Sequence, residues 1–363
     1  MRQAQKLAKS KQLYIITDTN TEKEIRMPTP RKAQISLDAT PYYHCVSRCV
    51  RRGFLCGKDN TTNQSYEHRR QWLEDKLLHI AKIFAIDICS YAIMSNHYHV
   101  VLHIDKAQAN SWSTEQVLQH YHQQFKGTLL TQRYMKPDER LHMSAPEIDA
   151  VISSSTIYRK RLYSVSWFMK SINEFVAREA NKEDECTGHF WEGRFKSQAL
   201  LDEAAILSCM AYVDLNPIRA NMATTPETSD HTSIKQRIDM VTNQKTKQSD
   251  NNPNHNSINQ PKCLMPFVGN PRENNPKGIS FNLLDYLELV NDTGKVIRDD
   301  KRGYIKNSSP ILTRLGVDSN HWLTLTKTFE QHFIGAASIE TQLIKQYKYS
   351  VKQAINQLAV NSS

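Results

Sequence analysis

The chain has 363 residues, of which 39% are hydrophobic, so it can bury a sizeable core and is long enough for two domains. Its formal net charge of +10 favours a polyanionic partner, either nucleic acid or an anionic membrane surface. No apolar run approaches the roughly 18 residues of a membrane span. The polar, basic N-terminus also lacks the apolar stretch of a secretory signal. We therefore expect no membrane partner.

The seven cysteines are scattered, odd in number and without a CxxC pair. This usage is typical of a reduced, intracellular protein, so we expect a cytoplasmic location. Cys45, Cys49 and Cys56 beside His44 could form a zinc site. On an extended segment, however, Cys45 and Cys49 would lie ~13 Å apart. Small core residues are therefore the interpretation we favour for these thiols.

Residues 1–38 are polar and basic, which predicts an extended N-terminal arm. A folded unit is expected over residues 39–222. Its predicted elements are a strand at 42–48, a helix at 65–85, strands at 86–94 and 97–104, a partly helical segment at 105–161, a helix at 164–182, a strand at 195–201 and a helix from Asp202 that stops before Pro217. The order β-α-β-β-α-β predicts an α+β fold, a ferredoxin-like split βαβ sandwich with an antiparallel sheet.

After Met222 the composition changes. Residues 223–265 are rich in Asn, Thr, Ser, Gln and Lys, which predicts a polar linker with room for one helix. Residues 266–363 are predicted to form a mostly helical C-terminal region, with helical patterns at 283–290, 322–333 and 339–358. The sequence indicates no function for this region.

A pair of histidines, His97 and His99, begins a Val-rich run that predicts a strand. Residues i and i+2 of a strand point to the same face, so two imidazoles project side by side and can bind one metal ion. His103 shares that face but lies ~13 Å from His99, outside a common ligand set. The chain has 14 histidines, so a pair of this spacing can occur by chance. Considered alone, the pair is more simply interpreted as two hydrogen-bonded histidines on a half-buried strand than as metal ligands.

A second His-Tyr-His triplet, at residues 120–122, serves as an internal comparison. It lies in a segment with a helical pattern, where ~100° per residue turns His120 and His122 about 200° apart. These two imidazoles cannot share a metal ion. The triplet therefore indicates a metal pair only where it lies in a strand.

Tyr212 and Asn216 are four residues apart on the last predicted helix, so they share one face, one turn apart. An apolar stripe of Ile206, Met210 and Val213 can pack this helix on the sheet and tip Tyr212 toward the histidine pair. An ordinary helical tyrosine is the plainer interpretation of Tyr212 alone, since the chain holds 15 tyrosines.

The combination nevertheless makes coherent chemistry. A tyrosine hydroxyl can attack phosphorus and form a covalent phosphotyrosine, which preserves the bond energy for rejoining. The phenol, with a pKa normally near ~10, needs a nearby metal ion to help deprotonate it. Metal ligands His97, His99 and Asn216 leave coordination positions open, and such a set suits Mg²⁺ or Mn²⁺ better than structural zinc.

Four segments then occur in the order of a known family. They are Tyr43-His44-Cys45-Val46-Ser47-Arg48, Met94-Ser95-Asn96-His97-Tyr98-His99-Val100-Val101-Leu102, Gly188-His189-Phe190-Trp191-Glu192-Gly193-Arg194-Phe195-Lys196-Ser197 and Tyr212-Val213-Asp214-Leu215-Asn216-Pro217-Ile218-Arg219-Ala220. Over about residues 40–222 the chain resembles the REP-associated tyrosine transposases of the HUH nuclease superfamily.

This resemblance implies a ferredoxin-like core, a divalent metal and cleavage of single-stranded DNA near a hairpin. It also implies a 5′-phosphotyrosine intermediate and a free 3′-hydroxyl. His97 and His99 match the family's histidine pair, Tyr212 its nucleophile and Asn216 its polar ligand. The protein would then lie on the nucleoid when bound to DNA, as a monomer or a homodimer. The segment at 105–161 and the regions before Met27 and after Met222 exceed the family's core. They leave open which surface contacts the hairpin.

Basic residues flank the predicted site and are candidates for contacts with DNA phosphates. They are Arg48, Arg51, Arg52, Arg194 and Lys196. Phe190 or Trp191 could stack on an exposed base, although a core position for Trp191 and a solvated basic rim are equally simple interpretations.

Three other functions remain open from the sequence. The fold could serve as a non-cutting DNA-binding regulator. An RNA-binding protein could share this strand order, but it would need exposed aromatic residues on the central strands. A zinc hydrolase could use the same histidines, and its product would carry no protein–DNA bond.

Overall fold

A computed structural model describes residues 34–50, 55–58, 63–247, 259–269, 276–298, 336–337, 343–344 and 346–347. Its sheet contains β1 (Tyr42–Arg48), β2 (Ile86–Ile93), β3 (His97–Ile104), β4 (Lys196–Leu200) and β5 (Ala336–Ala337) in the order β2-β3-β1-β4-β5. The first four pair antiparallel, and β5 runs parallel to β4. The order β2-β3-β1-β4 confirms the predicted α+β fold and its split βαβ arrangement.

Both faces of this sheet are covered, so its central strands bury side chains on both faces. Along β3, Tyr98, Val100 and Leu102 enter one core cluster, whereas Val101 enters a second cluster on the opposite face. This alternation is the two-residue period of a strand. His97 and His99 have the same parity as Val101, so they belong to the second face.

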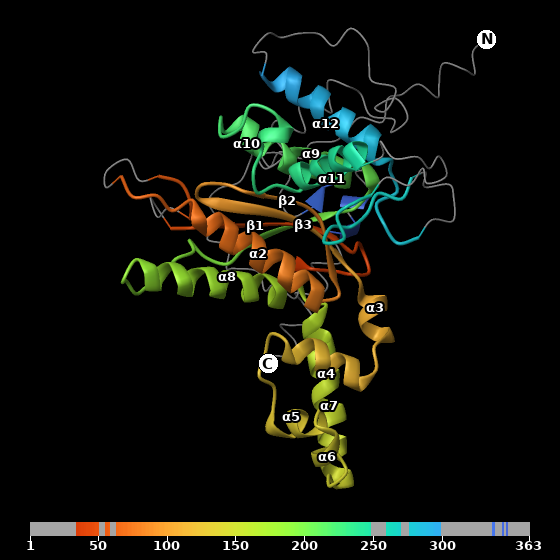
Figure 1. The fold of residues 1–363 in the computed structure, drawn as a ribbon. Helices are drawn as coiled ribbons and strands as arrows, with labels where there is room; N and C mark the ends of the chain where they lie inside the picture. The colour runs from red at the N-terminus through yellow and green to blue at the C-terminus, as the bar shows by residue number, and fades with distance from the viewer. Residues whose placement is uncertain are drawn as a thin grey trace, which may run out of the picture.

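Helices α2 (His68–Ile83) and α8 (Val165–Glu183) cover the first face (Figure 1). The helix α2 begins later than expected, because Ser65 pairs with Lys58 in an isolated bridge. Arg69, fully buried at the start of α2, donates to Glu183 at 2.6 Å and also to Asp184. These contacts, between a buried guanidinium and two carboxylates that remain in contact with solvent, join one end of α2 to the end of α8.

The segment between β3 and α8 forms a helical projection, which Figure 1 shows extending away from the sheet. It consists of α3 (Lys106–Ser111), α4 (Thr114–His122), α5 (Leu129–Tyr134), α6 (Pro137–Arg140) and α7 (Ala145–Leu162). At its base the Arg161 guanidinium lies 4.3 Å from the ring centroid of Trp167 and donates to the hydroxyl of Tyr121. The segment was predicted to be irregular and partly helical, and it consists of short helices joined by turns.

The second face of the sheet carries α9 (Glu203–Asp214), α10 (Asn216–Arg219), the 3-10 turn η1 (Pro226–Thr228), α11 (Ser233–Lys247) and α12 (Leu283–Arg298). Asp202 caps α9, since its carboxylate accepts from the backbone N–H of Ala205 at 2.7 Å. The helix ends at Asp214, as expected from Pro217, which sits in the first turn of the short α10 where its missing N–H is harmless.

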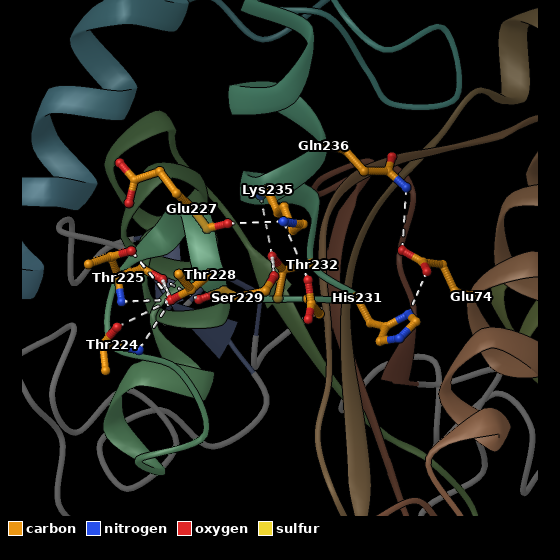
Figure 2. A network of polar contacts seen from close by, with 11 residues as sticks. Glu74, Thr224, Thr225, Glu227, Thr228, Ser229, His231, Thr232, Lys235 and Gln236 are labelled. Carbon is orange, nitrogen blue, oxygen red and sulfur yellow. Dashed lines mark hydrogen bonds and ion pairs between the residues drawn. The ribbon is translucent and has the colours of Figure 1, made fainter. Parts of the chain in front are cut away.

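Residues 229–247 do not behave as the expected polar linker. Thr232 bridges to Ala92 on the edge strand β2, and the N–H of Ile93 donates to His231 at 3.2 Å. The imidazole of His231 lies 2.6 Å from Glu74 on α2, as Figure 2 shows. The edge of β2 is thereby covered, which removes an exposed strand edge. Polar residues of this segment make hydrogen bonds at the edge of β2, so the segment is packed against the sheet.

The structure describes only part of the other regions that the sequence predicts. Residues 1–33 and 322–333 lie outside the described residues, while Ile35 and Leu37 at the end of the predicted arm pack against the core. The pattern at 283–290 falls within α12, and 339–358 is described only at 343–344 and 346–347, which are helical. Within the described part of the chain, no helix is long and apolar enough to cross a membrane.

A buried carboxylate joins this second layer to the sheet. Asp214, fully buried at the end of α9, accepts from Ser90 on β2 at 3.1 Å, from Ser233 on α11 at 2.6 Å and from Tyr286 on α12 at 2.5 Å. Burial raises the pKa of Asp214, and these three donors and Arg237 oppose that shift. The network ties the helix that carries Tyr212 to three other elements.

Replacing Tyr286 with Phe is expected to lower the free energy of unfolding by about 1–3 kcal/mol, because Asp214 then lacks one of its buried donors. Chemical denaturation monitored by circular dichroism measures this change. Tyr163→Phe, which alters a tyrosine packed against the core of the other face, is the matched control. Equal stability of Tyr286→Phe and the wild type would contradict the importance of this network.

Candidate active site

The histidine pair lies at the start of β3, opposite the end of β1. In the β1–β3 register His97 faces Arg48 and His99 faces Val46. His99 is fully buried and His97 half-buried, and their ring centroids are 4.9 Å apart with planes at 77°. The structure therefore brings the two imidazoles side by side on the face that α9 covers.

Tyr212 packs from α9 onto His99 of this pair. Its ring centroid lies 5.6 Å from that of His99, with an edge-to-face angle of 81°, and the side chain is buried. Asn216, one turn further on, opens α10 and is also buried. The amide nitrogen of Asn216 has no hydrogen-bond partner among the described residues.

A third imidazole completes the cluster. The Nε2 atom of His44 on β1 lies 3.0 Å from Nδ1 of His99, and the two rings are nearly parallel, with centroids 5.2 Å apart. His44 also meets the edge of Tyr212 at 6.2 Å. Local sequence patterns did not predict that His44 belongs to this site. His44 points to the same face of β1 as Val46 and Arg48, because the three alternate along the strand. Val46 and Arg48 lie opposite His99 and His97, so the pattern could have indicated His44 only if the pairing of β1 with β3 were known.

Burial keeps these three imidazoles neutral. Desolvation, with a smaller contribution from Arg48, lowers the pKa of His97 to about 4, and desolvation lowers that of His44 to about 4 as well. The pKa of His99 falls well below its usual value, first through burial and then through its neighbour His44. Neutral imidazole is the form that binds a metal ion.

Arg219 at the end of α10 was also missed as a site residue. Its guanidinium carbon lies 4.7 Å from the ring centroid of Tyr212, and its charge contributes to lowering the pKa of His99. The ring of Tyr212 therefore contacts two neutral imidazoles, those of His44 and His99, and one cation, that of Arg219. The signal in the sequence was the three-residue spacing from Asn216, which returns to the same side of a helix.

The other predicted residues are distributed around this centre. Arg48 is exposed at the end of β1, Lys196 is exposed opposite Val46 on β4, and Arg194 is exposed just before it. Arg51 and Arg52 lie outside the described residues. The site therefore has exposed cations on two adjacent strands beside the histidines.

The aromatic pair proposed for base stacking is engaged within the fold. Trp191 is partly buried, donates from its indole to the backbone oxygen of Asn173 at 2.9 Å and meets Tyr98 edge-on at 5.8 Å. Phe190 is buried. The core interpretation of Trp191 is the one the structure supports.

The alternative zinc site, formed by the three cysteines beside His44, finds no support. Cys45, Cys49 and Cys56 are buried thiols, and burial raises the pKa of Cys56 to about 12. Across the described residues no group of three His, Cys, Asp or Glu side chains is arranged to hold a metal ion. His103 instead pairs with Asp87 at 2.9 Å.

Comparisons with known proteins assign no family. No protein-family model matches the chain, and no curated protein matches it. Among solved structures, the chain is similar to a REP-associated tyrosine transposase bound to a REP hairpin, with 7% identity and a TM-score of 0.33. The alignment covers 68% of this chain and 99% of that one. So low a TM-score establishes neither fold nor function, and the assignments below depend on the site itself.

Proposed function

We propose that this protein is a transposase-like enzyme that cuts and rejoins single-stranded DNA at or near hairpins. In this proposal Tyr212 is the nucleophile and a divalent metal, Mg²⁺ or Mn²⁺, is held by His97, His99 and Asn216. One observation carries it: a buried tyrosine lies edge to face with the neutral imidazole of His99, whose neighbour on the strand is His97, and an arginine cation lies over the tyrosine ring. The four sequence segments that resemble the REP-associated transposases contain these site residues and support the same proposal.

The residues present fit a hard divalent ion. Nδ1 of His97 lies 2.6 Å from the amide oxygen of Asn96, an acceptor, so the ring proton belongs on Nδ1 and the lone pair on Nε2. The buried amide of Asn216, whose nitrogen the described fold does not engage, can supply a neutral oxygen. A bound Mg²⁺ or Mn²⁺ would polarise the phosphodiester and offset charge on its oxygens.

The covalent step is a transesterification. The Tyr212 oxygen forms a bond to phosphorus while the bond from phosphorus to the 3′ oxygen breaks. The phenolic proton is lost to solvent, and the departing 3′ oxygen takes up a proton. The products are a 5′-phosphotyrosine and a free 3′-hydroxyl, and reversal of the step rejoins the strand. Arg219, whose cation lies over the ring, favours the phenolate and can contact a phosphate oxygen.

The exposed cations Arg48, Arg194 and Lys196 would hold the DNA backbone beside this centre, and Arg51 and Arg52 would extend the same basic rim. Binding through phosphates predicts an affinity that falls steeply with salt concentration. We propose a cytoplasmic location, with the protein on the nucleoid when it is bound to DNA.

The first test is a denaturing gel of the protein incubated with single-stranded hairpin DNA and Mn²⁺ or Mg²⁺. We expect a protein–DNA adduct that requires the metal and is absent in Tyr212→Phe, which removes only the attacking oxygen. Tyr42→Phe, a substitution near the other end of β1, is the matched control and should retain the adduct. An adduct that persists in Tyr212→Phe would overturn the assignment of the nucleophile.

The gel also separates the alternative functions. Tight, salt-dependent hairpin binding without an adduct across a panel of hairpins would favour the non-cutting regulator. Cleavage without an adduct would favour a metal hydrolase. RNA binding in the manner of an RNA-recognition sheet is not favoured, because Tyr43 and Tyr98 on the central strands β1 and β3 are fully buried.

Metal binding can be measured without DNA. At a Mn²⁺ concentration of about 100 times its dissociation constant, binding to the folded state should stabilise the wild type by about 2.7 kcal/mol. The double substitution His97→Ala with His99→Ala should remove this stabilisation, as followed by thermal unfolding with and without Mn²⁺. A double variant that Mn²⁺ stabilises as much as the wild type would place the metal elsewhere.

Arg219→Gln should slow adduct formation by roughly 100-fold, since it removes a preorganised positive charge beside the developing phosphate charge. Arg219→Lys should restore part of the rate. Arg178→Gln, an exposed arginine paired with Glu174 on α8, is the charge-matched control. Single-turnover kinetics at saturating DNA gives these rates, and an unchanged rate in Arg219→Gln would exclude Arg219 from the reaction.

A further inference from the structure

Three side chains form a hydrogen-bonded row across three adjacent strands beneath Tyr212. Gln198 on β4 pairs in register with His44 on β1, and its side-chain oxygen lies 3.4 Å from Nδ1 of His44. Nε2 of His44 then lies 3.0 Å from Nδ1 of His99 on β3. All three side chains are buried, so bulk water does not compete for these contacts.

With the Gln198 amide oxygen facing His44, the row has one consistent order of protons. The oxygen of Gln198 can only accept, so Nδ1 of His44 carries a proton. A neutral imidazole protonated at Nδ1 has its lone pair at Nε2, and that lone pair must accept the proton on Nδ1 of His99. His99 is then also an Nδ1–H tautomer, with its own lone pair at Nε2. The lowered pKa values of both histidines agree with neutral rings.

We propose that His44, held by Gln198, is a positioning residue that fixes the Nδ1–H tautomer of His99 and so directs the Nε2 lone pair of His99 to the metal. The metal part of this inference rests on the proposed function. His44 is not itself a ligand, because its Nε2 is engaged by His99. His97 reaches the same tautomer through Asn96, so both members of the pair present Nε2.

The reverse arrangement, in which each proton of the row lies on the other partner of its hydrogen bond, is also chemically possible. If the Gln198 amide were turned, its nitrogen would donate to Nδ1 of His44. His44 would then donate from Nε2 to Nδ1 of His99, and the proton of His99 would lie on Nε2. In that state His99 could not bind a metal through Nε2 without losing its contact with His44. The tautomer of the metal-free protein therefore decides between the two orders.

The first experiment is ¹⁵N NMR of the full-length, metal-free protein labelled at histidine, assigned with single histidine substitutions. We expect the Nδ1–H tautomer for both His44 and His99. The Nε2–H tautomer at His99 would overturn the inference, whether or not the protein cuts DNA. This readout does not depend on the proposed function.

The second experiment measures Mn²⁺ affinity by calorimetry, with Mn²⁺ alone as the ligand. His44→Phe should weaken binding by about 10- to 100-fold, the usual effect of losing an outer hydrogen-bond partner of a metal ligand. His44→Gln, whose amide oxygen can still accept from His99, should recover part of this loss. His103→Phe, on the same strand as His99 but paired with Asp87, should bind as the wild type does.

Gln198→Glu and Gln198→Leu provide the same test without altering a histidine. A carboxylate can only accept and should preserve Mn²⁺ affinity, whereas leucine should weaken it. Equal affinity of folded His44→Phe, Gln198→Leu and the wild type would overturn the positioning role. Absence of Mn²⁺ binding in the wild type would instead contradict the proposed metal site, and the NMR result would still decide the tautomer.

Discussion

The antiparallel pairing of β1 with β3 places His44, His97 and His99 on the one face of the sheet that α9 covers. Because side chains alternate along a strand, a slip of one residue in β1 would turn His44 into the opposite core and bring Cys45 under Tyr212. The register is held on both sides of β1, since β4 pairs with it as well and aligns Gln198 with His44. The chemistry of the site is therefore a consequence of strand register.

The same burial that fixes the register sets the electrostatics of the site. Buried imidazoles lose their protons, so a cluster of three histidines beside two arginines carries no mutual repulsion from charged rings. Above them, Asp214 ties the tyrosine helix to β2, α11 and α12. The region after Met222 thus helps to hold Tyr212 over the sheet, and the position of Tyr212 depends on residues far from it in sequence.

Local patterns predicted a large part of this arrangement. The two-residue period of β3 placed His97 and His99 together, and the helical period placed Asn216 one turn from Tyr212. Residues whose position depends on pairing between distant segments were missed. Ser233 meets Asp214 from a segment whose polar composition indicated a linker, and Tyr286 meets it from the predicted helical C-terminal region. The strand registers that align His44 and Gln198 are likewise set by pairing between distant segments. Trp191 satisfies its indole N–H within the core, a contact that its sequence neighbours do not reveal.

The central claim is that this strand face holds a divalent metal ion beneath Tyr212. Anomalous X-ray diffraction from crystals grown with Mn²⁺ tests it most directly, because the signal locates manganese without reference to any reaction. The account predicts an anomalous peak within bonding distance of Nε2 of both His97 and His99, with His44 outside the coordination shell. A peak bound to His44 or at another place in the molecule, or no peak at saturating Mn²⁺, would contradict it.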